Sequence, residues 1–300
     1  MRKPRKKPMG KSKHERKDGI WISDVDSMHT FMPYLLPDRI ANEAVAEFEI
    51  DLTAANEFLE KKNTEDVKFR YTLFHLVVAA LAKTIALRPK LNRFYSGHRL
   101  YERKEISLSF VCKKALNDTG AESLLTVKVD RESETDPLEQ AYSAIKKRVT
   151  GVREMSETDN ATDSMEKLAK LPRWLLRILV KLVFWADYHG YIPSGLLDDV
   201  PYYSTVFISN LGSIKMSASY HHLANFGTNS IFACIGEKQW KPIFARDGSY
   251  EMKETVALSL TADERIADGV YYAKSFRFLK YFLEHPESLE RPLMEEPDNV

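Results

Sequence analysis

Residues 257–269 read ALSLTADERIADG and combine three patterns in a short length of chain. The first six residues are apolar or small, which favours a strand buried in a core. A charged run follows and ends in Asp268 and Gly269, directly before a segment from about 270 to 284 with helical spacing. The pattern predicts a core strand, a charged loop and a helix, with Gly269 at a tight turn between strand and helix.

Two segments nearer the N-terminus contain further motifs. One has IPSGLL at 192–197 and then VFISNLG at 206–212, where a predicted strand ends near Ser209 and an Asn-Leu-Gly turn follows. The other contains DLT at 51–53, FHLV at 74–77 and RPKLNRF at 88–94. Taken alone, Ser209 could simply cap the end of its strand, because the turn fits either role.

In this order and spacing, the three segments resemble the chloramphenicol acetyltransferase superfamily. They are most similar to the catalytic domain of the acyltransferase subunit of 2-oxo acid dehydrogenase complexes, over roughly residues 40–290. The resemblance implies a two-layer α/β (α+β) sandwich with a mixed sheet, assembled as a homotrimer with active sites in channels between subunits. It also implies coenzyme A as the acyl-carrying substrate and a thiol or hydroxyl acceptor.

The resemblance also implies which residues form the active site. The family signature is H-x-x-x-D-G, in which the His is the general base and the Asp holds the loop through an ion pair. In this sequence Glu264 stands at the position of the His, and Asp268 is the matching Asp. Ser209 matches the serine that the neighbouring subunit contributes as a hydrogen-bond donor to the oxyanion.

A glutamate at the position of the base changes the chemistry. A thiol of pKa ~8.5 loses its proton less readily to a carboxylate of pKa ~4.3 than to an imidazole of pKa ~6.5, which removes about 2.7 kcal/mol of driving force. Burial of Glu264 beside the core strand would strengthen the base, whereas a pair with Arg265 would weaken it. Glu264 is therefore an altered base, a relic in a catalytically degenerate trimeric binding or scaffold protein, or a residue whose role another group has taken.

His221 and His222 are the candidates for that replacement. They lie between Ser209 and the 257–269 segment, where the family has a loop near its active site. A metal site is not expected at this pair, because adjacent residues of a strand point apart and no cysteine or carboxylate lies at ligand spacing. His222 is retained as a candidate catalytic residue, with an exposed or structural histidine pair as the alternative.

Composition excludes several classes of protein. The 300 residues are 44% hydrophobic and 29% charged, unlike a disordered chain, a collagen-like fibre or a disulfide-stapled miniprotein. Cys112 and Cys234 are the only cysteines, which argues for a reducing, cytoplasmic compartment. No apolar run approaches the ~20 residues that cross a bilayer, and no lipoyl-attachment module precedes the domain. We therefore expect neither a transmembrane segment nor a covalently bound lipoyl group.

Charge is distributed unevenly along the chain. Residues 1–17 contain nine Lys or Arg and one acidic residue, which leaves 35 basic and 42 acidic residues elsewhere. The sequence predicts a disordered basic arm at 1–19, an acyltransferase-like domain at 20–290 and an acidic tail at 291–300. Such an arm can simply be solvated. The alternative is an arm that binds nucleic acid, an anionic surface or an acidic partner protein. The absence of an aromatic residue before Trp21 disfavours nucleic acid.

The segment 172–189 predicts a helix of unusual composition, with Pro172 in its first turn. Its side chains are apolar almost all round, apart from a basic stripe of Arg173, Arg177 and Lys181. We expect this helix to be buried against the domain or a neighbouring subunit, with a position in a membrane interface as the alternative.

The remaining elements follow from periodicity. Strands are predicted at 44–51, 99–112, 124–130, 203–209, 230–236 and 254–261, and helices at 53–62, 71–87 and 137–150. Strands and helices do not alternate strictly, which favours a layered α/β or α+β fold over a doubly wound sheet. His75 is expected in the core and His98 in a hairpin turn.

Overall fold

The computed structural model describes residues 15–113, 122–154, 168–193, 195, 197 and 200–297. The first fourteen residues of the predicted arm and the last three residues of the predicted tail lie outside the described residues. So do residues 156–165, whose polar sequence predicts a loop.

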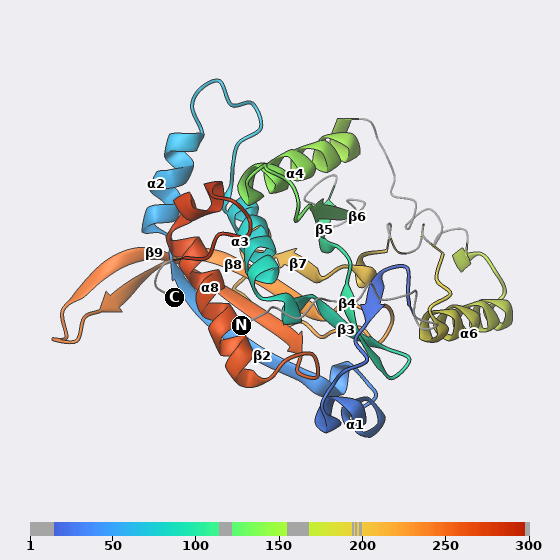
Figure 1. Ribbon diagram of the computed structural model, residues 1–300. Coiled ribbons are helices and arrows are strands. Elements are labelled where there is room, and N and C mark those ends of the chain that lie inside the picture. Colours follow the sequence, from blue (N-terminus) through green and yellow to red (C-terminus); the bar gives the residue numbers. More distant parts are fainter. Residues whose placement is uncertain are drawn as a thin grey trace.

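A six-stranded mixed sheet forms the centre of the molecule (Figure 1). Its strand order is β2-β9-β8-β7-β5-β6, and β7 runs parallel to both of its neighbours while the other pairs are antiparallel. The strands are β2 (Glu43–Asp51), β5 (Ile106–Lys113), β6 (Glu122–Val129), β7 (Val206–Asn210), β8 (Ile231–Phe244) and β9 (Tyr250–Asp263). The mixed sheet confirms the predicted fold class.

Helices cover one face of this sheet (Figure 1). They are α2 (Thr53–Lys62), α3 (Leu73–Leu87), α4 (Pro137–Glu154) and α8 (Gly269–Glu284), all close to their predicted bounds. The core lies between the two layers. Every second residue of a strand points into it: Val206 and Ile208 of β7 point to the helices, whereas Phe207 packs in a smaller cluster on the other face. The protein therefore has two layers, as expected.

A small sheet with the order β1-β4-β3 lies beside the large one. Its strands are β1 (Gly19–Trp21), β3 (Arg93–Ser96) and β4 (Arg99–Arg103). The single strand predicted at 99–112 is wrong, because the chain breaks after Arg103 and continues as β5 in the large sheet. The predicted turn at His98 is confirmed: Gly97 and His98 have φ values of 55° and 60°, which a two-residue hairpin loop requires.

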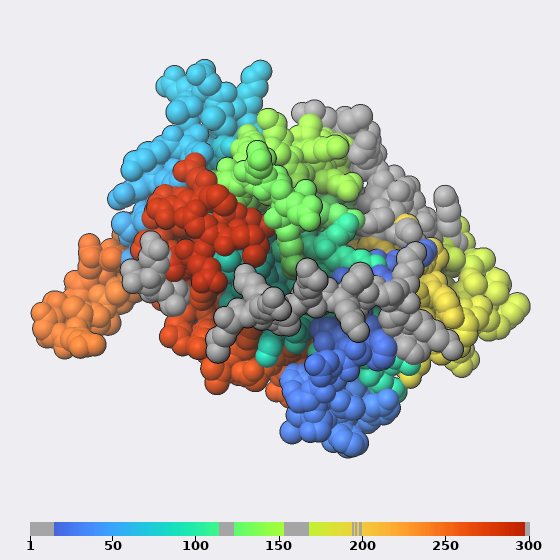
Figure 2. Space-filling model, in the orientation of Figure 1, coloured from blue at the N-terminus to red at the C-terminus, as the bar shows by residue number. Residues whose placement is uncertain are grey.

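Strands β8 and β9 are longer than predicted and form a hairpin that projects from the body of the molecule (Figure 2). Strand β7 is shorter at its start, because Pro201–Tyr203 form a 3-10 turn. The α1 helix (Ser27–Leu35) precedes β2.

The α6 helix (Arg173–His189) has its predicted bounds, but it is not buried against its own domain. Burial against a neighbouring subunit, the other arrangement expected, stays a prediction. Pro172 is its N-cap, not a residue of its first turn, and Gly190 closes it with a φ of 77°. Asp187 is the one fully buried residue of the helix, and the large apolar side chains stay exposed in the single chain.

Candidate functional site

Two close contacts between backbone segments fix the turn that follows Ser209. After β7 the chain enters a 3-10 turn, Leu211–Ile214, in which a Cβ on Gly212 would collide with the carbonyl of Gly236. Gly236 lies in the irregular part of β8 between Ile235 and Lys238, and a Cβ there would meet the backbone of Ala218. Gly212 and Gly236 therefore let three segments of the same chain pack closely: the turn after β7, the irregular part of β8 and the backbone at Ala218. A side chain at either glycine would prevent this approach.

Ser209 lies on the sheet face that carries no helices, in a row of small polar side chains. It pairs with Cys234, which pairs with Ser259. The Ser259 hydroxyl donates to the carbonyl of Ser219 at 2.7 Å, and burial raises the pKa of the Cys234 thiol to about 11. Within the described part of the chain, the half-buried Ser209 hydroxyl has no hydrogen-bond partner. Of this row, Ser209 alone has a hydroxyl available to a ligand.

The structure brings the histidine pair to the same face as Ser209. The His221 ring stacks on Phe232 with 4.0 Å between centroids, and on His222 with 4.7 Å. Phe232 precedes Cys234 by two residues, so its side chain is on the Ser209 side of the sheet. Both histidines are exposed.

A hydrogen bond sets the tautomer of His221. Its Nδ1 lies 2.9 Å from the carbonyl oxygen of His222. A carbonyl only accepts, so Nδ1 carries the proton, and Nε2 of the neutral ring is left as the basic nitrogen. His221 therefore has both a fixed ring and a free acceptor, whereas no such bond orients His222 among the described residues.

Glu264 occupies a different environment from the one expected. It is exposed, and its backbone N–H donates to the carbonyl of Asn42 at 2.9 Å. Arg265 does not pair with it but forms two bonds to Asp263, from Nε at 2.8 Å and from Nη2 at 2.7 Å. Of the two possibilities considered for Glu264, neither burial nor a pair with Arg265 occurs in the single chain.

The cluster beneath Glu264 explains its exposure. Asp263 is fully buried, and the Arg265 Nη1 also donates to the carbonyls of Leu36 and Pro37. Arg39 approaches Asp263 to 3.7 Å, and burial lowers the pKa of Arg39. With Asp263 and Arg265 both directed inwards, the side chain between them is left outside. Asp263 and Arg265 are two residues apart at the end of a strand and therefore point to the same side, a spacing from which their ion pair could have been predicted.

Asp268 is the N-cap of α8. Its carboxylate accepts from the Tyr271 N–H at 2.9 Å, which holds the pKa of Asp268 below its ordinary value, and Lys90 lies 3.8 Å away. Gly269 is the first residue of α8, and a Cβ there would meet no atom within 4 Å. The tight turn expected at Gly269 is therefore wrong.

One chain does not bring Ser209 and Glu264 together. Glu264 follows Ser259 by five residues, and Ser259 is two strands away from Ser209. With a rise of about 3.3 Å per residue and about 4.8 Å between strands, the two Cα atoms are separated by about 16 Å along the sheet and about 10 Å across it. The predicted residues form two separate groups in the single chain.

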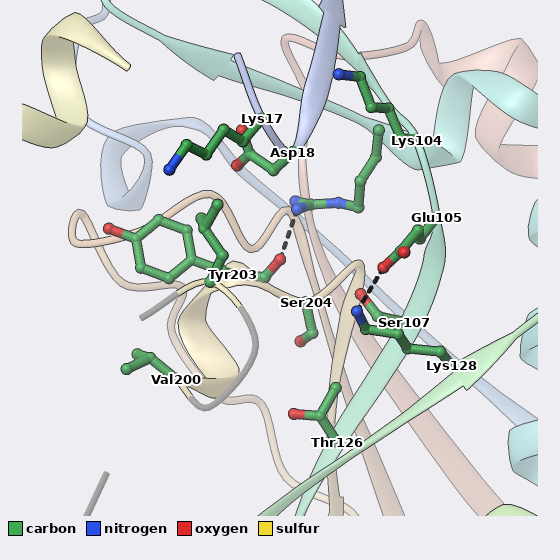
Figure 3. Close-up of a pocket in the computed structure, with 12 residues that line it drawn as sticks. Lys17, Asp18, Lys104, Glu105, Ser107, Thr126, Lys128, Val200, Tyr203 and Ser204 are labelled. Carbon is green, nitrogen blue, oxygen red and sulfur yellow. Dashed lines mark hydrogen bonds and ion pairs between the residues drawn. The ribbon is translucent and has the colours of Figure 1, made fainter. Parts of the chain in front are cut away.

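A basic cavity of about 230 Å³ opens beside the edge of the sheet (Figure 3). Lys17, Lys104 and Lys128 line it together with Ser107 and Thr126, whose side chains lie on the helix-free face. Arg103 donates to the carbonyls of Tyr203 and Thr228, and burial lowers the pKa of Arg103 to about 10. Glu105 pairs with Lys128 at 2.7 Å. The excess of cations suits an anionic or strongly polar ligand, but neither Ser209 nor Glu264 lines this cavity.

Two further kinds of site are not found in the described ranges. No three His, Cys, Asp or Glu residues of the described chain lie close enough to hold a metal ion. None of the described helices is both long and apolar enough to cross a bilayer.

Comparisons with known proteins identify the fold. Residues 202–290 match the family model for 2-oxoacid dehydrogenases acyltransferase (catalytic domain), and no curated protein matches the chain. The structure of a probable dihydrolipoamide acetyltransferase from Listeria monocytogenes is 16% identical and superposes over 92% of this chain and 96% of its own, with a TM-score of 0.55. The fold is chloramphenicol acetyltransferase-like.

Two other solved structures have the same fold. The cubic core of a pyruvate dehydrogenase multienzyme complex is 14% identical over 89% of this chain and 93% of its own, with a TM-score of 0.57. A chloramphenicol acetyltransferase is 10% identical over 88% and 99%, with a TM-score of 0.50. The section that matches the acyltransferase family model contains Ser209, His221, His222, Glu264 and Asp268.

Proposed function

We propose that this protein is a coenzyme A-dependent acyltransferase of the 2-oxo acid dehydrogenase acyltransferase type. It would move an acyl group between coenzyme A and a thiol or hydroxyl acceptor. The observation that carries the proposal is the Ser209 hydroxyl, which has no partner in the described chain and is held by the Gly212 turn on the helix-free face. The acyltransferase-like fold and the family match over residues 202–290 support it.

The active form would be a homotrimer with sites between subunits. Ser209 and Glu264 are too far apart in one chain to act on one substrate, so a complete site needs the Ser209 of one subunit beside the Glu264 of the next. The solved core of a pyruvate dehydrogenase complex shows that a chain of this fold assembles into a larger core. The two cysteines are both free and buried, which fits the cytoplasm as the compartment.

In this mechanism the base removes a proton from the acceptor thiol or hydroxyl. The acceptor then attacks the thioester carbonyl, and Ser209 donates a hydrogen bond to the oxyanion that forms. When the intermediate collapses, the carbon–sulfur bond breaks and the base returns the proton to the departing coenzyme A thiolate. Asp268 would keep the loop before α8 in place through its bond to the Tyr271 N–H.

Glu264 is the proposed base by its position, with Nε2 of His221, or less directly His222, as the alternative. Exposure in the single chain weakens the case for Glu264, and a neighbouring subunit would have to cover it. The His221 ring is oriented by its Nδ1 bond and lies on the Ser209 face. Separate Glu264→Gln and His221→Gln variants distinguish the two, because only loss of the true base lowers the rate of acyl transfer sharply.

Acyl transfer from acetyl-coenzyme A to a thiol acceptor tests the site. Ser209→Ala removes an oxyanion donor and is expected to lower kcat about 10²-fold, with little change in KM. Ser213→Ala is the matched control, because Ser213 is exposed in the same turn and bonds only the Asn210 carbonyl. Equal activity in the Ser209 and Ser213 variants would reject the site.

A catalytically degenerate trimeric scaffold is the second candidate. The observation that favours it is Glu264, an exposed carboxylate where the family has its histidine. In that case no acceptor is acylated, with or without binding of coenzyme A, and Glu264→Gln changes no measurable property. A Glu264→His variant that gains transfer would support this candidate.

A further inference from the structure

The α6 helix lies at one side of the molecule (Figure 1). Its large apolar side chains are exposed to solvent. The exposed fractions are 65% for Trp174, 47% for Ile178, 55% for Leu182 and 57% for Trp185. We call these four residues the α6 apolar strip. Two tryptophans on one exposed strip are costly for a surface that faces only water, and such strips mark interaction surfaces.

Cations flank this strip on one side. At 100° per residue, Trp174, Ile178 and Trp185 fall within about 40° of one another around the helix axis. Lys181, Arg177 and Arg173 lie next to them, progressively further around the same exposed half. The half-buried residues of α6, such as Leu179 and Val183, lie opposite and face the protein. The exposed half of α6 is therefore apolar along one edge. Along the other edge, the three cations alternate with the exposed side chains of Val180, Phe184 and Tyr188.

No acidic side chain offsets this charge on the exposed half of α6. The one acid of the helix, Asp187, is buried and pairs with Arg16 at 3.0 Å. Arg16 is itself buried, also donates to the Asp187 carbonyl, and is bound by Asp18 at 2.8 Å. These bonds fix the N-terminal chain against the C-terminal end of α6.

The described chain begins at Glu15, and Arg16 is bonded to the C-terminal end of α6. In the sequence, seven Lys or Arg residues precede Glu15: Arg2, Lys3, Arg5, Lys6, Lys7, Lys11 and Lys13. These charges therefore directly precede, in sequence, a residue that is held at α6.

We propose that α6 docks on the surface of a bilayer that contains anionic lipids. The α6 apolar strip enters the boundary between headgroups and acyl chains, where tryptophan is favoured, and the Arg and Lys side chains reach the lipid phosphates. This inference is independent of the proposed catalytic function.

Other occupants fit this surface less well. A second copy that presents its own α6 would bring like charges face to face, and cores of protein interfaces are depleted of charged residues. A different surface of a neighbouring subunit is the occupant that the measurement of oligomer mass below distinguishes. A nucleic acid would use the charges and the tryptophans but would leave Ile178 and Leu182 without an apolar partner. An anionic bilayer satisfies both the apolar strip and the cations that flank it.

Binding of the full-length protein to vesicles tests the proposal. Vesicles of phosphatidylcholine with phosphatidylglycerol should sediment the protein and shift its tryptophan emission to shorter wavelength, whereas phosphatidylcholine alone should do neither. High salt should weaken the binding. Trp174→Ala with Trp185→Ala should reduce the affinity about tenfold or more, because binding strength follows the apolar area that enters the bilayer.

Trp240→Ala is the matched control. Trp240 is 67% exposed, but it lies on the β8–β9 hairpin far along the chain from α6. Its variant should bind like the unaltered protein. Far-ultraviolet circular dichroism of all variants checks that they are folded.

Three results would overturn the proposal. The first is absence of binding to the anionic vesicles. The second is an equal loss of binding in the Trp240 control. The third is a fall in the oligomer mass, measured by light scattering, in the folded Trp174→Ala, Trp185→Ala variant, which would show that a second copy of the chain occupies the strip.

Discussion

His75 links the stability of the fold to pH. Its ring is 3% exposed among Phe69, Tyr71 and Tyr142, and its Nδ1 accepts from the Thr72 N–H at 3.0 Å. Burial lowers the pKa of His75 to about 4, from about 6.5 in the unfolded chain. Between these values the unfolded chain binds a proton that the folded chain does not, so stability falls as pH decreases through this range.

The His75→Gln variant tests this dependence. Glutamine keeps the capping interaction at the start of α3 but does not titrate. Between pH 6.5 and pH 4, the unaltered protein should lose about 3 kcal/mol more unfolding free energy than the variant. Urea unfolding at both pH values measures the difference. His285→Gln, at an exposed position, should leave the dependence unchanged. An equal slope in the unaltered protein and in His75→Gln would contradict the assignment.

The environment of a single side chain is predictable from the sequence where the helix or strand that carries it determines that environment. His75 is predicted in the core because the helix around it is apolar on all sides. The direction of the Glu264 side chain could not be predicted, because it depends on the bonds of Arg265 to Asp263 and to the carbonyls of Leu36 and Pro37. Those carbonyls are more than two hundred residues away in the chain, and no local pattern reports them.

At the scale of elements, the two glycines next to the predicted site residues should respond oppositely to alanine. Gly212→Ala forces a Cβ into the Gly236 carbonyl and should destabilise the turn after Ser209 by more than 1 kcal/mol. Gly269→Ala meets open space at the start of α8 and should stabilise the protein by about 0.4–1 kcal/mol. Thermal or urea unfolding of both variants checks the signs. If Gly269→Ala destabilised the protein, that result would contradict the open space at Gly269 and support the tight turn that the sequence predicts there.

The helices and most strands are predictable because their apolar residues follow a period of 3.6 or 2. The prediction of a single strand at 99–112 is wrong. Both halves of this segment are apolar enough for a strand, and only their pairing, the first half in the small sheet and the second in the large one, shows that they are two strands. The α6 helix is a different case. Its apolar composition predicts burial against the domain or a neighbouring subunit, and the structure contradicts only burial against its own domain.

At the scale of the whole molecule, the proposed site is divided between subunits. A Ser209→Ala variant and a Glu264→Gln variant should each be weakly active as homotrimers. Mixed before refolding, they form trimers in which about a quarter of the interfaces combine an intact Ser209 with an intact Glu264, if assembly is random. Acyl transfer should then recover to about that fraction of the unaltered rate.

Two results of the mixing experiment would contradict the account. Mixed trimers that stay inactive would show that the two residues do not share a site. A Glu264→Gln homotrimer with full activity would remove Glu264 as the base and leave His221 or His222. Mass measurement of the mixtures checks that mixed trimers form.

Calorimetric titration of the purified protein with coenzyme A and with acetyl-coenzyme A tests the central claim most directly. The account predicts micromolar binding at a number of sites equal to the number of subunits. It also predicts that Ser209→Ala leaves coenzyme A binding largely unchanged, because that hydroxyl acts on the oxyanion. Absence of binding to either ligand would contradict the acyltransferase proposal and leave a scaffold of the same fold.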